Sequence, residues 1–484
     1  MNRKIVFFTV SRLILLEALL MILPLVVSLL YLEYSMALSF IISVGIAALC
    51  GGMGWWFLRP VKGEETRLYP REGFLIVALA WISTSVIGAV PFYISGEIPS
   101  FLDAFFETVS GFTTTGATIL TRIEEMCHGA LLWRSFTHWI GGMGVLVLMM
   151  ALSPAGEEQG RTIHIMRAEM PGPIVGKLVP KVRETARLLY LLYIGLTILE
   201  VLFLLFGGMS LFEAVVHAFA TAGTGGFGIR ADSFASYSPY LQWTVSVFML
   251  LFGVNFNIYY LLILRRFRDA FRNAELRCYF AIAVVATGIL TVNLIPVFQS
   301  FGEAVRVSFF EVSSIMTTTG FGVVDINSLP GLSKAVLLLL MMIGACAGST
   351  GGGLKVARVM LLFKTARRDL RRLLHPRSVG VVQMDGNRVE DYTLRNLSTF
   401  SALYALILLA TFFILSFDAF DFETNFSAAV SCFNNIGPAY GAAASDYSAF
   451  SAVSKLALSF AMLFGRLEVF PLLLACSPSS WTKK

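Results

Sequence analysis

Four short segments of the chain end in a glycine preceded by small or hydroxyl-bearing residues, a pattern suited to binding a monovalent cation through backbone oxygens. The four tetrads are Thr113-Thr114-Thr115-Gly116, Ala222-Gly223-Thr224-Gly225, Thr317-Thr318-Thr319-Gly320 and Asn434-Asn435-Ile436-Gly437. A partly dehydrated ion needs a cage of oxygens, and rings of backbone carbonyls supply one. Glycine permits positive φ and leaves room for opposing strands. No carboxylate accompanies the tetrads, which favours a monovalent over a divalent ion.

The tetrads belong to an internal repeat. Residues 105–116 and 309–320 read FFETVSGFTTTG and FFEVSSIMTTTG and are identical at eight of twelve positions. Residues 426–437 form a weaker copy, and residues 214–225 are placed mainly by their flanking sequences. Successive tetrads lie roughly a hundred residues apart, a period that suits a duplicated membrane hairpin rather than a solenoid.

The segment before each glycine is long enough only for a short helix. The stretch from Asp103 to Phe112 would span about 15 Å at 1.5 Å per residue, about half of the hydrocarbon layer. Such a half-helix and its non-helical return are tolerated at that depth only inside protein or beside a water-filled cavity. One tetrad alone would suggest an ordinary loop turn, but four predict a shared cavity. Partially negative helix C-termini pointing into it would favour cations.

Composition places these hairpins in a membrane. The chain is 56% hydrophobic and 14% charged, whereas a soluble domain carries about 25% charged residues. Apolar runs long enough to cross about 30 Å of hydrocarbon predict an all-α integral membrane protein. The expected spans are 11–31, 36–58, 72–96, 131–153, 185–207, 240–263, 276–297, 331–374, 394–416 and 450–475. Two leading transmembrane helices and their loop (1–71) would precede four pseudo-fourfold helix–pore loop–helix repeats, namely 72–160, 161–270, 271–385 and 386–484.

The distribution of basic residues predicts the orientation, because cytoplasmic loops are enriched in Lys and Arg. In this arrangement 30 of the 37 Lys and Arg residues fall on one side. Both termini are therefore expected to be cytoplasmic, with the tetrads toward the outside. The net charge of +6 needs no nucleic-acid partner. The basic cluster at 367–372 suits anionic headgroups of the lipid bilayer or an acidic face of a cytoplasmic subunit. The six cysteines lack the spacing of a disulfide framework or a metal site.

The apolar run at 331–374 is interrupted by five glycines within residues 344–353. Each glycine costs a helix about 1 kcal/mol relative to alanine, so we expect a non-helical loop there. At membrane depth such a loop must lie against protein or the permeation cavity, where it could obstruct ions. Close helix packing through small residues is an alternative. A phosphate-binding loop is disfavoured because the GxxxxGK[ST] pattern is absent.

Arg466 lies in the middle of the last expected span, where a charge is costly and usually faces a bundle interior or water. We hypothesise that it projects into the pore below the tetrads, bonds carbonyls of the 344–353 loop and opposes unrestrained cation flow. The alternative is an arginine bonded to a neighbouring helix away from the pore. Glu107 and Glu311 occupy equivalent positions in two repeats and would brace the short helices or, less favourably, raise cation density.

These motifs resemble those of the Trk/Ktr/HKT family of potassium transporters over essentially the full chain. The resemblance is carried by VSGFTTTGAT at 109–118, TGGFG at 224–228, MTTTGFG at 316–322, GACAGSTGGGLKVAR at 344–358, NNIGP at 434–438 and GRLEVFP at 465–471. It implies a single-chain potassium pathway with a four-glycine filter. Sodium-favouring members carry Ser at the first of these glycines, so Gly116 favours potassium.

The resemblance also implies the residues of the site. The filter would comprise Thr114, Thr115, Gly116, Thr224, Gly225, Thr318, Thr319, Gly320, Asn435, Ile436 and Gly437, all but Thr114, Thr318 and Asn435 being expected K⁺ ligands. In the second copy, Gly223 and Gly226 remain alternatives to Gly225. The gate would comprise Gly344, Gly348, Ser349, Thr350, Gly351, Gly352, Gly353, Lys355 and Arg466.

The expected function is potassium uptake across the bacterial plasma (inner) membrane, with K⁺ as the transported ion and no organic cofactor in this chain. By resemblance, the chain forms a homodimer and is gated by a cytoplasmic, TrkA-like ring of Rossmann-type regulatory subunits that binds NAD, ATP or ADP. The alternative is a symporter that couples K⁺ to H⁺ or Na⁺, although the tetrads offer no titratable residue. An enzyme is not expected, because no Ser/His/Asp, HExxH or paired-Asp set converges at one depth.

Overall fold

The computed structural model describes residues 3–59, 69–144, 147–148, 182–377 and 380–482. These residues are mostly helical, which confirms the all-α class. Within them, strands occur only in one antiparallel hairpin of β1 (Gln383–Met384) and β2 (Asn387–Arg388), with Gln383 opposite Arg388. The expected boundary at 160/161 lies outside the described residues.

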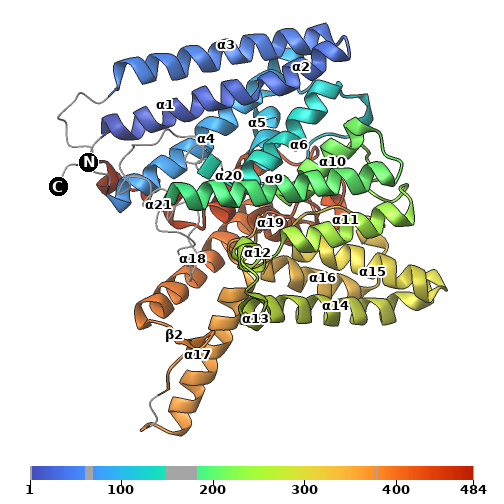
Figure 1. Ribbon diagram of the computed structural model, residues 1–484, viewed down its shortest axis with the longest axis vertical. Coiled ribbons are helices and arrows are strands. Elements are labelled where there is room, and N and C mark those ends of the chain that lie inside the picture. Colours follow the sequence, from blue (N-terminus) through green and yellow to red (C-terminus); the bar gives the residue numbers. More distant parts are fainter. Residues whose placement is uncertain (1–2, 60–68, 145–146, 149–181, 378–379, 483–484) are drawn as a thin grey trace.

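Three helices precede the repeated part of the chain: α1 (Arg3–Leu20), α2 (Ile22–Leu30) and α3 (Tyr34–Phe57). The first expected span therefore begins earlier than position 11 and is interrupted near Met21. Pro24 explains the interruption, because its ring conflicts with the carbonyl four residues earlier. In Figure 1, α1 and α3 lie side by side along one flank. Exposed apolar side chains such as Ile41 and Trp56 on α3 suit contact with lipid.

Four groups of helices follow, which we call repeats 1 to 4, and each begins with a long apolar helix. The long helices are α4 (Pro70–Ser95), α9 (Val182–Phe206), α14 (Ala274–Phe298) and α18 (Asp391–Leu415). Among the described residues, six helical segments are long and apolar enough to cross a membrane: α1 with α2, then α3, and these four. Figure 1 shows α3, α9 and α14 running roughly parallel, as membrane-crossing helices do.

Each long helix is followed by a short one, as expected for a re-entrant hairpin. The short helices are α5 (Phe101–Phe112), α10 (Leu211–Gly223), α15 (Phe301–Met316) and α19 (Phe422–Phe433). Every one begins at a side-chain cap whose oxygen accepts the backbone N–H three residues on: Ser100, Ser210, Ser300 and Asp421. Such caps satisfy amides that the helix leaves unpaired. They fix where the four short helices start.

After the short helix and its return, each repeat contains a third helix, which we call the post-return helix and which ends in the middle of the molecule. These helices are α6 (His128–Gly142), α11 (Pro239–Phe252), α16 (Gly331–Ile343) and α20 (Ala452–Arg466). They are continued by α12 (Phe256–Ile263), α17 (Val356–Leu374) and α21 (Phe470–Cys476) in repeats 2, 3 and 4. The interruption of the run at 331–374 is confirmed. The expectation of continuous spans at 240–263 and 450–475 is wrong, and α12 turns by 90° from α11.

Glycines explain two of these helix ends. A Cβ added at Gly141 would collide with the carbonyl oxygen of Phe112, and a Cβ at Gly465 would collide with that of Phe433. Phe112 and Phe433 are the last residues of short helices α5 and α19. In repeats 1 and 4, α6 and α20 therefore approach the C-terminal end of the short helix so closely that only glycine fits. Within the expected span 131–153, helix α6 ends at Gly142. The later residues of this span lie mostly outside the described part of the chain.

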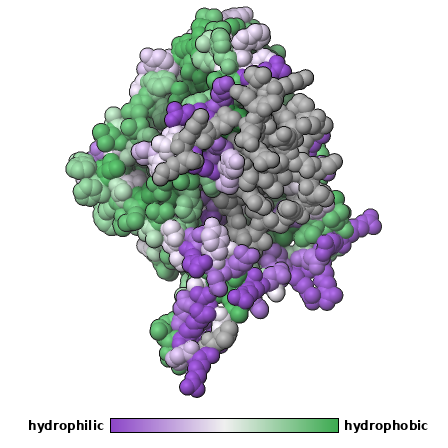
Figure 2. Space-filling model, turned by 90° about the vertical axis from the view of Figure 1, so that its left-hand side faces the viewer, coloured by the Kyte–Doolittle hydropathy of each residue, from purple (hydrophilic) through white to green (hydrophobic). Residues whose placement is uncertain are grey.

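The remaining helical elements of the described chain are α13 (Phe267–Arg272) and the short 3₁₀ turns at Ile123–Glu125, Ile326–Ser328, Gly441–Ala443 and Pro478–Trp481. The Arg3 guanidinium donates to the carbonyl of Trp481 at 2.7 Å, so the two ends of the chain lie at the same face. Helix α17 projects from the bundle in Figure 1, and Figure 2 shows hydrophilic residues gathered on this projection beside a hydrophobic flank.

Candidate ion pathway and gate

The four returns from the short helices share one backbone conformation. Thr114, Thr224, Thr318 and Asn435 have positive φ of 56, 55, 61 and 57°. Two residues later a glycine again has positive φ: Gly116 at 78°, Gly226 at 79°, Gly320 at 85° and Gly437 at 104°. The N–H of the residue between them donates to the carbonyl five residues earlier, at 2.8–3.0 Å in all four copies. This repeated geometry aligns the four segments residue by residue.

The alignment corrects the second tetrad by one position. Gly226, rather than Gly225, is equivalent to Gly116, Gly320 and Gly437. Gly225 takes the position of Thr115, since its N–H donates to the carbonyl of Ala220 at 2.9 Å. The run Gly223-Thr224-Gly225-Gly226 contains three glycines that the sequence alone cannot distinguish as the equivalent of Gly116. The backbone angles identify Gly226, because it is the one with positive φ.

The four segments close into a ring. A Cβ added at Gly116 would collide with the carbonyl oxygen of Gly225, one at Gly226 with that of Thr319, and one at Gly320 with that of Ile436. A Cβ at Gly437 would stand 2.6 Å from the carbonyl oxygen of Thr115, which completes the circuit. Each glycine thus lies against the carbonyl of its neighbour. We call Thr115, Gly116, Gly225, Gly226, Thr319, Gly320, Ile436 and Gly437 the ring.

Neutral side chains around the ring are bonded to one another. The hydroxyls of Thr113 and Thr115 lie 2.8 Å apart, as do those of Thr317 and Thr319. Asn435 donates its side-chain N–H to the Thr115 hydroxyl at 3.0 Å, which ties repeat 4 to repeat 1. These contacts engage the hydroxyls of Thr113, Thr115, Thr317 and Thr319 with one another, and the other oxygens of the ring are main-chain carbonyls, the type of ligand that a carbonyl-lined cation site uses.

The chain beyond the ring is braced by buried polar contacts. Glu107 accepts from the Nε of Arg134 and the hydroxyl of Thr118, at 2.8 and 2.9 Å. Arg134 also donates to the carbonyl of Gly228 at 3.3 Å and lies over the ring of Phe227, so it joins the returns of repeats 1 and 2. In repeat 3, Glu311 accepts the N–H of Val323 at 3.0 Å. These contacts support the bracing interpretation of both glutamates.

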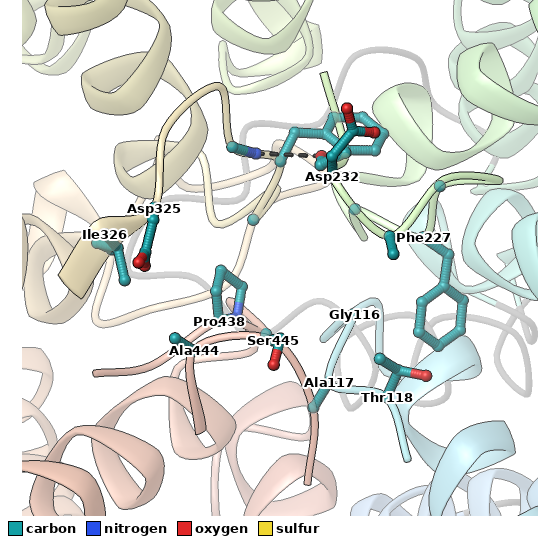
Figure 3. A pocket seen from close by; sticks show the side chains of 18 of the residues that line it. Gly116, Ala117, Thr118, Phe227, Asp232, Asp325, Ile326, Pro438, Ala444 and Ser445 are labelled. Carbon is teal, nitrogen blue, oxygen red and sulfur yellow. Dashed lines mark hydrogen bonds between the residues drawn. The ribbon is translucent and has the colours of Figure 1, made fainter. Parts of the chain in front are cut away.

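A cavity of about 470 Å³ borders the ring, and its lining includes all four positive-φ glycines: Gly116, Gly226, Gly320 and Gly437. Figure 3 looks into this cavity, with labelled residues of the four return segments around it, including Asp232 and Asp325. Gly226 lines it and Gly225 does not, in agreement with the corrected alignment. The four positive-φ glycines therefore lie where the cavity and the ring adjoin.

The 344–353 loop lies against the residues that precede the ring in repeats 3 and 4. The N–H of Gly353 donates to the carbonyl of Asn434 at 3.1 Å, and the N–H of Gly352 donates to the hydroxyl of Thr318 at 2.6 Å. Positive φ at Gly344, Gly348 and Gly353 keeps the segment non-helical. The expectation of a non-helical loop is therefore confirmed, and its place beside a permeation pathway stays a prediction.

Arg466 bonds this loop, as hypothesised. Its guanidinium donates to the carbonyl of Thr350 at 2.8 Å. It also donates to the carbonyl of Gly142 at 2.7 Å and to that of Gly141, at the end of α6. The arginine thus bridges the loop in repeat 3 to the end of α6 in repeat 1.

Other loop contacts involve both expected and unexpected residues. The Nζ of Lys355 donates to the carbonyl of Gly351. Ser349 donates to the carbonyl of Cys346 at 2.7 Å. Sequence reasoning missed Glu275, whose carboxylate accepts the N–H of Ala347 at 2.6 Å and of Ala357 at 3.2 Å and so ties the loop to the first turn of α17. An acidic residue in the first turn of an apolar span was the available signal.

Comparisons with known proteins agree with this architecture. The family model described as "TrkH: Cation transport protein" matches residues 38–483. The chain is 37% identical over 470 residues to the Trk system potassium uptake protein TrkH of Escherichia coli (strain K12), with 95% of each chain covered. It is 35% identical to TrkG of the same strain, covering 95% of this chain and 94% of TrkG. The crystal structure of the potassium transporter TrkH from Vibrio parahaemolyticus matches with a TM-score of 0.89 and 31% identity over 100% of both chains.

These matches extend over nearly the whole chain and concern transport proteins, which confirms the expectation of a transporter rather than an enzyme. The earlier resemblance to the broader potassium-transporter group is confirmed as well. The chain belongs to the TrkH family of cation transport proteins.

Proposed function

We propose that the chain takes up potassium across the bacterial inner membrane through a single-chain, channel-like pore. Its relatives carry the names of potassium uptake proteins. The observation that carries the proposal is the closed ring, in which four glycines lie against the carbonyls of their neighbours. Backbone carbonyls in such a ring replace the hydration shell of a partly dehydrated cation.

The filter of this pore is the ring together with Thr114, Thr224, Thr318 and Asn435, which fix its backbone. K⁺ is bound by main-chain oxygens of the ring, with Gly226 added to the residues expected from sequence. Glycine at all four positions favours K⁺ over Na⁺, by analogy with the family members that carry Ser at the first. The short helices α5, α10, α15 and α19 direct their partially negative ends toward the ring.

The gate consists of the 344–353 loop and Arg466. Through Gly352 and Gly353 the loop contacts Thr318 and Asn434, which precede the ring in repeats 3 and 4, so it blocks the exit from the filter. The guanidinium of Arg466 bonds the loop at Thr350, and its positive charge opposes a cation below the ring. Lys355 adds a second positive charge beside the loop. Opening therefore requires the loop to leave the underside of the filter.

Control of the gate comes from a cytoplasmic TrkA-like subunit that binds NAD, ATP or ADP, and the transporter works as a homodimer. Both termini face the cytoplasm, in agreement with their location at one face of the molecule. The exposed basic residues of α17, including Arg367, Arg371 and Arg372, offer an electrostatic surface on that side.

Growth of potassium-uptake-deficient cells on limiting potassium tests the function. The wild-type chain should restore growth, and the Gly116→Ser variant should restore it less and admit more Na⁺. Absence of rescue by a chain present in the membrane, together with absence of K⁺ flux in proteoliposomes, would contradict the proposal. Flux that follows membrane voltage without any proton or sodium gradient supports a channel-like pore over a symporter.

A further inference from the structure

In the return of repeat 3, the hydroxyl of Thr318 contacts the gate loop. The Thr318 side chain is fully buried and its hydroxyl accepts the N–H of Gly352 at 2.6 Å. The adjacent N–H of Gly353 bonds the carbonyl of Asn434 at 3.1 Å. Two consecutive loop amides are therefore held by two adjacent segments of the filter.

The contact is tightly fitted. A Cβ added at Gly351 would stand 2.8 Å from the carbonyl oxygen of Thr317, and one at Gly352 would collide with that of Asn434. No side chain separates the loop from the filter backbone at these positions. The loop consequently cannot move away from the filter without breaking the bond between Gly352 and Thr318.

Equivalent residues in the other repeats do not make this contact. Thr114 has the same backbone conformation, but its buried hydroxyl has no partner within the described part of the chain. The Thr224 hydroxyl donates to the carbonyl of Gly223 at 2.6 Å, and Asn435 bonds Met462 and Thr115. The four equivalent side chains thus differ in their hydrogen bonds, and the one that bonds the loop, Thr318, belongs to the repeat that contains the loop.

We propose that Thr318 is a positioning residue that couples the gate to the filter. The inference rests on the proposed function. With the loop in place, the Gly352 amide fixes the Thr318 hydroxyl and with it the left-handed turn that orients the third set of filter carbonyls. When the loop leaves, this constraint is released. Because coupling is reciprocal, K⁺ in the filter also changes the stability of the closed loop.

The test compares three variants of the full-length protein. Thr318→Val keeps the side-chain shape but removes the acceptor, which leaves a buried amide unpaired in the closed state. Thr318→Ser keeps the hydroxyl. Thr114→Val removes a hydroxyl at the same filter position without a loop contact and reports the effect on the filter alone.

Two readouts are needed. The first is the open fraction in patch recordings of reconstituted protein without regulatory subunit. The second is the labelling rate of native Cys346, a buried loop residue, by a small water-soluble thiol reagent, resolved by peptide mass spectrometry. Labelling is compared in K⁺ and in a large organic cation that does not enter the ring.

Thr318→Val should shift the closed-to-open ratio about tenfold toward open, equivalent to about 1.4 kcal/mol, and accelerate Cys346 labelling similarly. Thr318→Ser should restore wild-type gating. The K⁺-dependent difference in labelling should shrink in Thr318→Val and persist in Thr114→Val. If wild type conducts K⁺ but Thr318→Val and Thr114→Val behave alike in both readouts, the coupling is refuted and the proposed pore stands. If wild type conducts no K⁺, the proposed function itself fails.

Discussion

Repeats 1 and 3 have nearly the same return segment but different surroundings. Residues 105–116 and 309–320 are identical at eight of twelve positions, and both returns hold a pair of threonine hydroxyls 2.8 Å apart. Glu107 and Glu311 each accept the backbone N–H twelve residues on, from Ile119 and Val323, but in repeat 1 the glutamate also pairs with the buried Arg134. Within the described residues, repeat 3 is the one whose return is contacted by a glycine-rich loop of the same repeat. Symmetry is kept where an ion would be coordinated and lost where the path would be closed.

The largest expected effect tests the symmetric part. Alanine at Gly116 or Gly320 would put a Cβ into the carbonyl of the neighbouring segment at a positive φ that alanine disfavours. We expect potassium uptake to fall to background in both variants, with the protein still present in the membrane. Uptake assays in potassium-deficient cells measure this. Loss in one variant with normal uptake in the other would show that the two returns are not equivalent.

The next effect tests what repeat 1 has and repeat 3 lacks. Arg134→Met removes one partner of a buried ion pair whose side chains are 1 and 0% exposed. Leaving Glu107 unpaired should reduce stability by about 3–5 kcal/mol, seen as a lower thermal unfolding midpoint in detergent. Arg122→Met is the matched control, because its pair with Glu125 is exposed and should contribute little. Equal unfolding midpoints for the two variants would contradict a stabilising role for Arg134.

A smaller effect is expected at the contact that joins the two repeats. Arg466→Ala loses the bonds to Thr350 of the loop and Gly142 of α6, as well as a positive charge in the proposed pathway. Potassium flux through reconstituted protein without a regulatory subunit should rise several-fold, on the order of 1 kcal/mol in gating. Arg466→Lys, which keeps the charge but loses the forked geometry, should lie between. Unchanged flux and gating in Arg466→Ala would refute the role of this residue.

The sequence predicts the symmetric features better than the broken ones. Repetition of FFE and TTTG located the first and third returns, and a weaker copy at 426–437 located the fourth, but the glycine run around Gly225 left the second register open. Hydropathy missed the breaks at Val254 and Val469, since the residues that interrupt α11 and α20 are partly apolar and continue the pattern. Positive φ at Glu468 and Val469 is imposed by tertiary contacts, including the ion pair of Glu468 with Arg358. The contact between Thr318 and the loop depends on side-chain orientation in three dimensions and has no local signature.

The smallest expected effect is at the equivalent glutamates, Glu107 and Glu311. It distinguishes a role in bracing the short helices from a role in attracting cations by negative charge. Glu311→Gln keeps an oxygen that can accept the N–H of Val323, so stability should fall by less than about 1 kcal/mol and uptake should stay near wild type. Glu107→Gln faces the buried Arg134 and should cost clearly more, because it leaves a cation without its counter-charge. Unfolding midpoints and uptake rates of both variants are compared. If Glu311→Gln lowers uptake strongly without lowering the midpoint, its negative charge attracts the ion, and the two repeats differ in electrostatic role as well as in packing.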